Sequence, residues 1–335
     1  MSRLLRLSRL SSLAVLLALL AAPAFVPVWG QDWAKAALEK SPRHREYVAI
    51  PVPGTTRTVN TFVVYPEVST KAPVVVLIHE IFGLSDWMKL QADEFAAKGY
   101  IVLAPDLLSG LGPVAPASKP MAMPGMPGMA CDPMPCKTGG SPAPAMPPMD
   151  HSQMDHANMA PAPGAAFVAA TPGGTDAFPG QDSVTKAVMS LPPAQVTADL
   201  NAVSDYAEKI PSGNGKLAVG GFCWGGCKTF DFATHRPDLK LALSFYGPPP
   251  PAAAMAFIAA PVYGFYAGND MRIGAMIPQA TTDMKAAGKF YEPVTYAGAG
   301  HGFMRAGQAP DATPANKKAF EEAFARATTL LEKLK

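Results

Sequence analysis

Apolar runs of strand length alternate with segments of helical spacing in two blocks of the chain. In the first block, β-branched residues on either side of a PGTT turn predict two edge strands, and two continuous apolar runs predict buried parallel strands. One helix lies between these runs, with Ser85 as its expected N-cap and Gly99 at its C-terminal end. The predicted strands are 46–52, 58–65, 72–80 and 100–106, and the predicted helix is 85–99.

The second block begins near Ala194 and continues the same alternation to the end of the chain. Strands that alternate with helices favour a mostly parallel sheet covered by helices on both faces, which is an α/β fold. We therefore expect a single α/β domain over residues 31–335. The predicted helices are 195–210, 225–235, 277–288 and 316–334, and the predicted strands are 216–222, 239–247, 260–268 and 290–298.

Residues 112–181 interrupt this alternation with repeated Pro, Ala, Gly and Met and no helical or strand period. Proline at this density prevents regular hydrogen-bonded structure, so we predict a disordered, low-complexity insertion within the domain. Its MDHSQMDHANM stretch resembles methionine- and histidine-rich segments of exported copper-handling proteins, and thioether and imidazole groups suit copper. Two interpretations of this stretch stay open: a copper-binding site, and a low-complexity linker whose methionines only reflect its biased composition. The candidate ligands are His151, Met154, His156 and Met159.

The first thirty residues have the pattern of a secretory signal peptide. Three arginines precede the apolar stretch LAVLLALLAA, and small residues stand at a cleavage-type spacing near Ala24 and Gly30. The apolar stretch is near the lower limit for a membrane span, so a cleaved signal is favoured over an anchor. We expect a periplasmic or secreted protein with no stable membrane association after cleavage.

Composition narrows the classes of function. Hydrophobic residues make up 49 % of the 335 residues and charged residues 16 %, as in a globular domain, and the net charge of +2 gives no reason to expect nucleic acid. In an oxidising compartment Cys131 and Cys136 could form a disulfide, whereas Cys223 and Cys227 are one helical turn apart and are less suited to one.

Cys223 lies at the centre of a Gly-x-Cys-x-Gly sequence between a predicted buried strand and a predicted helix. This strand–turn–helix setting is that of a nucleophile elbow, in which glycines at 221 and 225 permit a tight turn. The helix N-terminus favours a thiolate and a developing oxyanion. A buried, inert cysteine is the alternative, but the combined setting favours a nucleophile.

Three further residues are candidates for the same site. Asp270 and His301 follow consecutive predicted strands, and the order nucleophile, acid, histidine is that of α/β-hydrolases. Glu80 is at the end of the predicted buried strand 72–80, where a carboxylate near a thiol can control the ionisation of the thiol. We interpret these residues as a Cys-His-Asp triad with an auxiliary Glu, and we expect no cofactor and no metal in this site.

The motifs IHEIFG, GFCWGG, GND and AGHGFMR, in that order, resemble the dienelactone hydrolase family of the α/β-hydrolase superfamily. The resemblance covers roughly residues 45–110 and 190–335. It implies an α/β-hydrolase fold, ester or lactone hydrolysis of the carboxymethylenebutenolidase type, and a small-molecule substrate. By this resemblance the catalytic residues are Cys223, Asp270, His301 and Glu80, the oxyanion hole is formed by the backbone of Ile81 and Trp224, and Arg305 binds a substrate carboxylate.

The resemblance also implies that Glu80 pairs with the resting thiol and accepts its proton when substrate binds. The chain departs from the family at Gly302, where the family has Ser, and it has no Arg between positions 58 and 235, where the family has a second substrate-binding arginine. Two other classes of function remain: a copper-handling protein that uses the insertion, and an inactive hydrolase scaffold that serves as a binding module.

Overall fold

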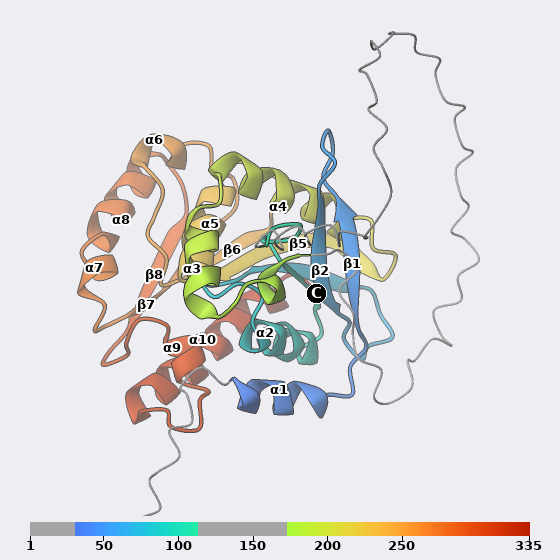
Figure 1. The fold of residues 1–335 in the computed structure, drawn as a ribbon. Coiled ribbons are helices and arrows are strands. Elements are labelled where there is room, and N and C mark those ends of the chain that lie inside the picture. Colours follow the sequence, from blue (N-terminus) through green and yellow to red (C-terminus); the bar gives the residue numbers. More distant parts are fainter. Residues whose placement is uncertain (1–30, 113–172) are drawn as a thin grey trace, which may run out of the picture. The chain divides into compact units, whose positions relative to one another are not determined.

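The computed structural model describes residues 31–112 and 173–335. Within them the central feature is an eight-stranded sheet of strand order β1-β2-β4-β3-β5-β6-β7-β8 (Figure 1). The strands are β1 (Arg45–Pro51), β2 (Thr58–Val64), β3 (Ala72–Ile78), β4 (Ile101–Pro105), β5 (Gly213–Phe222), β6 (Leu241–Phe245), β7 (Val262–Ala267) and β8 (Tyr291–Tyr296). The helices are α1 (Asp32–Glu39), α2 (Asp86–Ala97), the 3-10 turn η2 (Thr175–Ala177), α3 (Gln181–Met189), α4 (Pro193–Ala207), α5 (Trp224–Phe232), α6 (Ala252–Met255), α7 (Met271–Gly274), α8 (Ile277–Ala286), α9 (Phe303–Ala306) and α10 (Pro314–Glu332).

The predicted α/β class with a mostly parallel sheet is confirmed. The β1–β2 and β2–β4 pairs are antiparallel, and the five remaining neighbouring pairs, from β4–β3 to β7–β8, are parallel. Parallel pairing requires a crossover after each strand, and the helices between the strands provide these crossovers. The carboxyl ends of β3, β5, β7 and β8 therefore lie along one edge of the sheet.

One strand prediction was wrong in detail, because β2 is not an edge strand. It pairs with β1 on one side and with β4 on the other, where Phe62 faces Ala104 in register. Six of its seven residues are consequently buried, whereas β1, the true edge strand, is mostly half-exposed.

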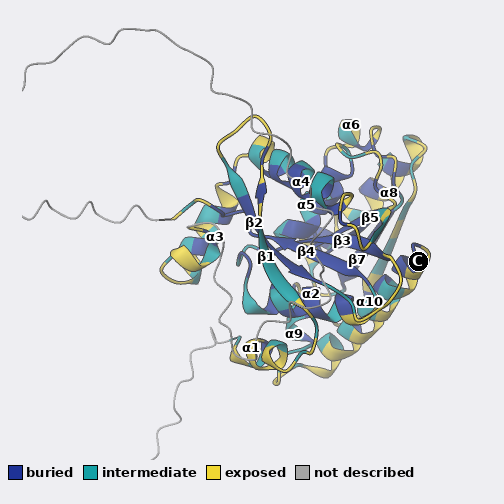
Figure 2. Cartoon of the chain, turned by 90° about the vertical axis from the view of Figure 1, so that its right-hand side faces the viewer, coloured by how far each residue is buried: buried dark blue, intermediate teal, exposed yellow. Residues whose placement is uncertain are grey.

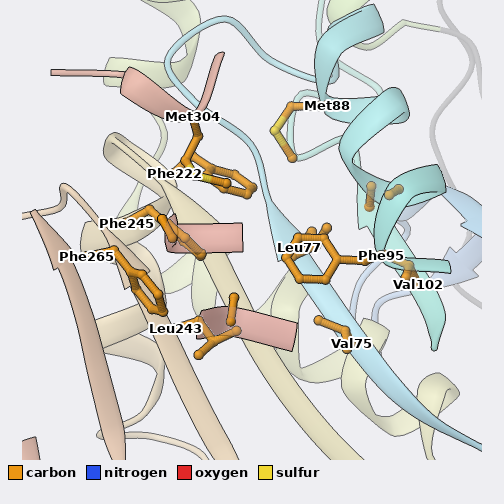
Figure 3. Close-up of a cluster of buried hydrophobic side chains, with 14 of the residues drawn as sticks. Val75, Leu77, Met88, Phe95, Val102, Phe222, Leu243, Phe245, Phe265 and Met304 are labelled. Carbon is orange, nitrogen blue, oxygen red and sulfur yellow. The ribbon is translucent and has the colours of Figure 1, made fainter. Parts of the chain in front are cut away.

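Two apolar layers cover the two faces of the sheet, and β3 contributes to both of them. Val75 and Leu77 pack in one layer with residues of α2, α9 and α10, part of which is drawn in Figure 3. Val74, Val76 and Ile78 pack in the other layer, which includes residues of α3, α4, α5 and α8. Figure 2 shows the result, with dark blue buried strands beneath helices whose outer faces are exposed. Full burial of a side chain of this kind stabilises the fold by about 1.5–3 kcal/mol.

The long predicted helices are confirmed within a few residues at each end. In α2 the side chain of Ser85 accepts a hydrogen bond from the backbone N–H of Met88, as expected of an N-cap, and Gly99 follows the helix with a φ of 92°. The helices that the periodicity did not predict are α1, α3, α6, α7 and α9. They have nine residues or fewer, so each offers few turns from which to recognise a helical period, although α5, of the same length as α3, was predicted.

The chain rejoins the core earlier than the predicted end of the insertion at residue 181. Gly173 forms a bridge with Ser109, and the N–H of Gly174 donates to the carbonyl oxygen of Leu111. Thr175 then donates from its hydroxyl to the Asp106 carboxylate, 2.9 Å away, and accepts from the N–H of Leu84 at the same distance. Residues 173–181 are therefore part of the packed domain rather than of the insertion.

Several predictions fall on residues outside the described part of the chain. These are the signal peptide over 1–30, the disulfide between Cys131 and Cys136, and the metal ligands His151, Met154, His156 and Met159. Between 31 and 112 and from 173 onward, none of the helices has the length and apolar character that crossing a membrane requires.

Candidate active site

Cys223 lies at a sharp turn between β5 and α5, as the Gly-x-Cys-x-Gly sequence predicts. Its backbone has φ 55° and ψ −113°, a conformation that residues other than glycine rarely adopt. Such a strained conformation persists only when the surrounding structure enforces it, and it is typical of functional sites. The turn brings the thiol to the N-terminal end of α5, where backbone N–H groups lie unused by the helix.

The two glycines that flank Cys223 are required for close backbone packing. A Cβ atom on Gly221 would lie 2.3 Å from the carbonyl oxygen of Gly225, and a Cβ atom on Gly225 would lie 2.3 Å from the carbonyl oxygen of Ile78. Both distances are far below van der Waals contact, so any other residue would push the turn away from β3. The glycines thus hold the thiol against the end of the sheet.

Asp270 and His301 lie beside Cys223, as predicted from their positions after β7 and β8. The Nε2 atom of His301 is 3.1 Å from the Sγ atom of Cys223, and its Nδ1 atom is 2.5 Å from the Oδ2 atom of Asp270. Because the carboxylate can only accept, Nδ1–H of His301 donates to Asp270, and the lone pair on Nε2 faces the thiol. Asp270 also caps α7, since its Oδ1 atom accepts from the N–H of Ile273.

The Cys223 thiol is held in its protonated form at rest. Burial, followed by the negative charge of Glu80, raises the pKa of Cys223 to about 11. The nearby backbone N–H groups of Trp224 and Ile81 oppose this rise. With such a pKa the thiolate fraction at neutral pH is on the order of 10⁻⁴, and the thiol needs a base to become a nucleophile.

Glu80 is a buried carboxylate at the end of β3, and its partner is Arg305 rather than the thiol. Its side chain is 3 % exposed, and its Oε2 atom accepts a 2.9 Å hydrogen bond from Nε of Arg305. Burial raises the pKa of Glu80, although the Arg305 charge opposes the rise. The guanidinium of Arg305 also lies over the ring of Phe82, 4.9 Å from its centroid. This arrangement differs from the pairing of Glu80 with the resting thiol that the resemblance implied.

A family model described as the dienelactone hydrolase family matches residues 59–335. The chain belongs to the dienelactone hydrolase family. The resemblance predicted from the motifs is thereby confirmed.

Proteins named as carboxymethylenebutenolidases align over parts of the chain. A candidate carboxymethylenebutenolidase of Methylorubrum extorquens is 36 % identical over 139 residues, which is 37 % of this chain and 46 % of that protein. The chain therefore spans about half the length of this relative. A candidate carboxymethylenebutenolidase of Yersinia pestis is 25 % identical over 242 residues, or 69 % of this chain and 68 % of that protein.

Solved structures share the fold. A candidate dienelactone hydrolase from Klebsiella pneumoniae superposes with a TM-score of 0.60 at 20 % identity, covering 87 % of this chain and 98 % of that one. The dienelactone hydrolase-like promiscuous phosphotriesterase P91, from metagenomic libraries, gives the same TM-score and coverage at 16 % identity. These similarities show the α/β-hydrolase fold of the family.

Tyr246 also lies beside the site, although no sequence motif pointed to it. It follows β6 directly, is fully buried, and has a φ of 40°, the other positive value among described residues that are not glycine. Its ring meets that of His301 edge-on, with centroids 5.1 Å apart. A polar aromatic residue directly after a buried strand was the available signal, because the carboxyl ends of β5, β6, β7 and β8 meet at one edge of the sheet.

Two further positions that the sequence singled out are Cys227 and Gly302. Cys223 and Cys227 are both free thiols, as predicted, and Cys227 lies one turn into α5 without a hydrogen bond to His301. Gly302, where the family has Ser, is left-handed, and a Cβ there would lie 3.7 Å from Arg305 and 3.8 Å from Glu80. Among the described residues no group of three or more His, Cys, Asp or Glu side chains is placed to hold a metal ion.

Proposed function

We propose that this protein hydrolyses a carboxylic ester or lactone through a covalent thioester on Cys223. The observation that carries the proposal is the continuous hydrogen-bond chain from the Cys223 thiol through His301 to Asp270. Membership of the dienelactone hydrolase family and the similarity to proteins named as carboxymethylenebutenolidases support the same reaction. The strained backbone at Cys223 supports a catalytic rather than a packing role for this thiol.

The reaction follows from the positions of these groups. The thiol proton passes to a base as Sγ attacks the substrate carbonyl carbon, and the carbonyl oxygen becomes an oxyanion that accepts from the N–H groups of Ile81 and Trp224. The group that accepted the thiol proton, His301 or Glu80, then gives it to the leaving alkoxide, and the C–O bond breaks to leave a thioester. A water molecule, deprotonated by His301, attacks the thioester and releases the acid and the free thiol.

Two bases are available for the thiol proton. His301 contacts Sγ directly, and Glu80 is close enough for its charge to raise the pKa of Cys223. Glu80 is held by Arg305 in the absence of substrate. A substrate carboxylate that binds Arg305 would compete for this guanidinium and free Glu80, whose raised pKa makes it a better proton acceptor than an ordinary carboxylate. In this mechanism the substrate itself prepares the nucleophile.

The experiment that tests this function uses the chain from residue 31 onward and two matched cysteine variants. Cys223→Ala is expected to abolish hydrolysis of p-nitrophenyl acetate and of a simple lactone, whereas Cys227→Ala retains it, because only Cys223 contacts His301. Iodoacetamide is expected to inactivate the wild type and Cys227→Ala alike. Full activity in Cys223→Ala, or loss of activity in Cys227→Ala alone, would contradict the assignment.

We also propose that the protein acts in the periplasm or outside the cell, on the basis of its N-terminal thirty residues. Intact-mass measurement and N-terminal sequencing of the protein from a periplasmic or culture fraction are expected to show a start near residue 25 or residue 31. A full-length chain recovered with the membranes would contradict cleavage and release.

A second candidate function, copper binding, is favoured by the repeated Met-Asp-His sequence at 149–151 and 154–156. We propose that this segment binds copper ions, and this function is compatible with hydrolysis at Cys223. Copper titration of the mature protein is expected to show binding that a deletion of 113–172 removes. Equal copper binding by the deletion variant would contradict the proposal.

A further inference from the structure

His79 is a fully buried histidine directly before Glu80, and the reaction described above does not use it. Its Nδ1 atom is 2.7 Å from the carbonyl oxygen of Glu80. A carbonyl oxygen only accepts, so Nδ1 carries the proton in this contact. Burial lowers the pKa of His79 despite the nearby Asp106 carboxylate, so the ring is neutral and Nε2 has a lone pair. Nε2 contacts no hydrogen-bond partner among the described residues.

The hydrogen bond from His79 to the Glu80 carbonyl, which also accepts from the N–H of Gly83 at 3.2 Å, helps to set the direction of another group. The carbonyl of Glu80 and the N–H of Ile81 belong to the same peptide unit, which is planar and trans, so the two groups point in opposite directions. The Ile81 N–H is near enough to the Cys223 thiol to lower the pKa of the thiol. A donor that holds the Glu80 carbonyl on one side of the peptide therefore holds the Ile81 N–H toward the thiol on the other side.

The same ring also contacts the residue that provides the second donor. The imidazole of His79 stacks on the indole of Trp224, with centroids 5.5 Å apart and planes at 12°. The backbones of the two segments also pack closely against each other, since a Cβ on Gly225 would lie 2.5 Å from the His79 carbonyl oxygen. One buried side chain thus touches the peptide of one N–H donor and the side chain of the other.

We propose that His79 is a positioning residue that holds the two N–H groups of the oxyanion hole in place. This proposal rests on the proposed function, because an oxyanion forms only if Cys223 attacks a carbonyl group. A histidine that merely filled space between β3 and α5 would need neither a proton on Nδ1 nor a fixed orientation of its ring. In this structure the hydrogen bond to the Glu80 carbonyl requires the proton on Nδ1, and the stacking on Trp224 fixes the orientation of the ring.

The test compares two substitutions that separate the hydrogen bond from the volume of the ring. His79→Phe keeps an aromatic ring against Trp224 but has no donor for the Glu80 carbonyl. His79→Asn loses the ring but places an amide N–H near the position of Nδ1. Each variant is assayed for kcat and KM with p-nitrophenyl acetate, for inhibition by a trifluoromethyl ketone that forms an oxyanion on the thiol, and for alkylation by iodoacetamide, which forms none.

His79→Phe is expected to lower kcat and the affinity for the ketone inhibitor by the same factor, about 10- to 100-fold. This loss is smaller than the about 10²–10³-fold loss of kcat that follows removal of an oxyanion-hole donor itself. Its KM and its alkylation rate at high pH, where the thiol is fully ionised, should stay near those of the wild type. His79→Asn is expected to recover most of the loss. Equal losses in alkylation and ketone binding, or no loss at all, would overturn the proposal.

One measurement needs no variant and remains available if His79→Phe does not fold. Long-range ¹H–¹⁵N spectra of the wild-type protein are expected to show His79 as the neutral tautomer with its proton on Nδ1. The other neutral tautomer, with its proton on Nε2, has no proton on Nδ1 to donate to the Glu80 carbonyl and would overturn the role of His79. A wild-type protein without esterase activity would instead contradict the proposed function, so the two failures can be told apart.

Discussion

The Nε atom of Arg305 donates a 2.9 Å hydrogen bond to the Glu80 carboxylate, although 225 residues separate the two along the chain. The Glu80 charge in turn raises the pKa of Cys223. This relationship gives Glu80 two opposite effects, because its charge suppresses the resting thiolate while its basicity provides an acceptor for the thiol proton. A single substitution can separate the two effects.

Glu80→Gln is expected to make alkylation by iodoacetamide easier and ester hydrolysis slower. Without the carboxylate charge the pKa of Cys223 falls from about 11, so the alkylation rate reaches half its plateau at a lower pH. Hydrolysis should fall by up to about 10²–10⁴-fold, the usual contribution of a general base, with His301 limiting the loss. The measurement is the pH dependence of both rates, with the exposed Glu292→Gln as control. Unchanged profiles for both reactions would leave Glu80 with no role at the thiol.

The same variant is expected to change how stability depends on pH. Burial raises the pKa of Glu80 above its unfolded value, so its contribution to stability is greatest at low pH and is lost as pH rises through the folded pKa. Glu80→Gln has no such loss. The Tm of the variant minus that of the wild type should therefore increase as pH rises above the unfolded pKa of a glutamate, about 4.3. A difference that decreases with pH would mean that Arg305 outweighs burial.

Asp270 has two roles that a pair of substitutions can separate. Its Oδ2 atom accepts from His301, and its Oδ1 atom accepts from Ile273 at the start of α7. Asp270→Asn keeps a capping side chain but removes the charge, so kcat should fall by about 10²–10⁴-fold with little change in stability. Asp270→Ala removes the cap as well and should cost about 1 kcal/mol more in unfolding free energy. Equal activity in wild type and Asp270→Asn would exclude Asp270 from the reaction.

Gly225 is expected to tolerate no side chain. A Cβ there would lie 2.3 Å from the Ile78 carbonyl oxygen, in backbone that cannot move without separating β3 from the elbow. Gly225→Ala should destabilise the protein by about 1–3 kcal/mol or more, as overpacking does, and should lower activity by displacing the Trp224 N–H. Gly274→Ala is the control, since a Cβ there would meet nothing within 4 Å. Similar urea midpoints for the two variants would contradict this account of the elbow.

The catalytic candidates could be placed from the sequence because each follows a parallel strand. Cys223, Asp270 and His301 come after β5, β7 and β8, and carboxyl ends of parallel strands share one edge of the sheet. Local patterns were therefore sufficient for residues that are widely separated in the chain. The long strands and helices were predictable for the same reason, since their periods are local.

The features that the sequence did not reveal depend on partners far away. β2 was expected at an edge because nothing in its own residues shows its pairing with β4. The Glu80–Arg305 pair replaces the expected contact of Glu80 with the thiol, and only the packed structure determines which partner is nearer. Thr175 bonds to Asp106, 69 residues earlier, from a stretch rich in Gly and Pro that has no period of its own.

The points where residues 113–172 leave and rejoin the described chain are adjacent, which makes this segment removable. Gly173 bridges Ser109, and the N–H of Gly174 donates to Leu111, so a linker of a few Gly and Ser residues can join 112 to 173. Each doubling of loop length changes the closure free energy by only about 0.6 kcal/mol. A deletion of 113–172 is therefore expected to be soluble, to melt cooperatively and to retain esterase activity.

A longer deletion, of 113–180, is expected to be less stable, because it removes the hydrogen bonds of Thr175 to Asp106 and Leu84. The loss of a buried partner costs about 1–3 kcal/mol, and Thr175→Val in the full-length chain should reproduce part of it without changing the loop. Chemical unfolding of the three variants beside the wild type measures these differences. If the shorter deletion aggregates or loses its cooperative transition while Thr175→Val does not, residues 113–172 contribute to the core and the boundary at 173 is wrong.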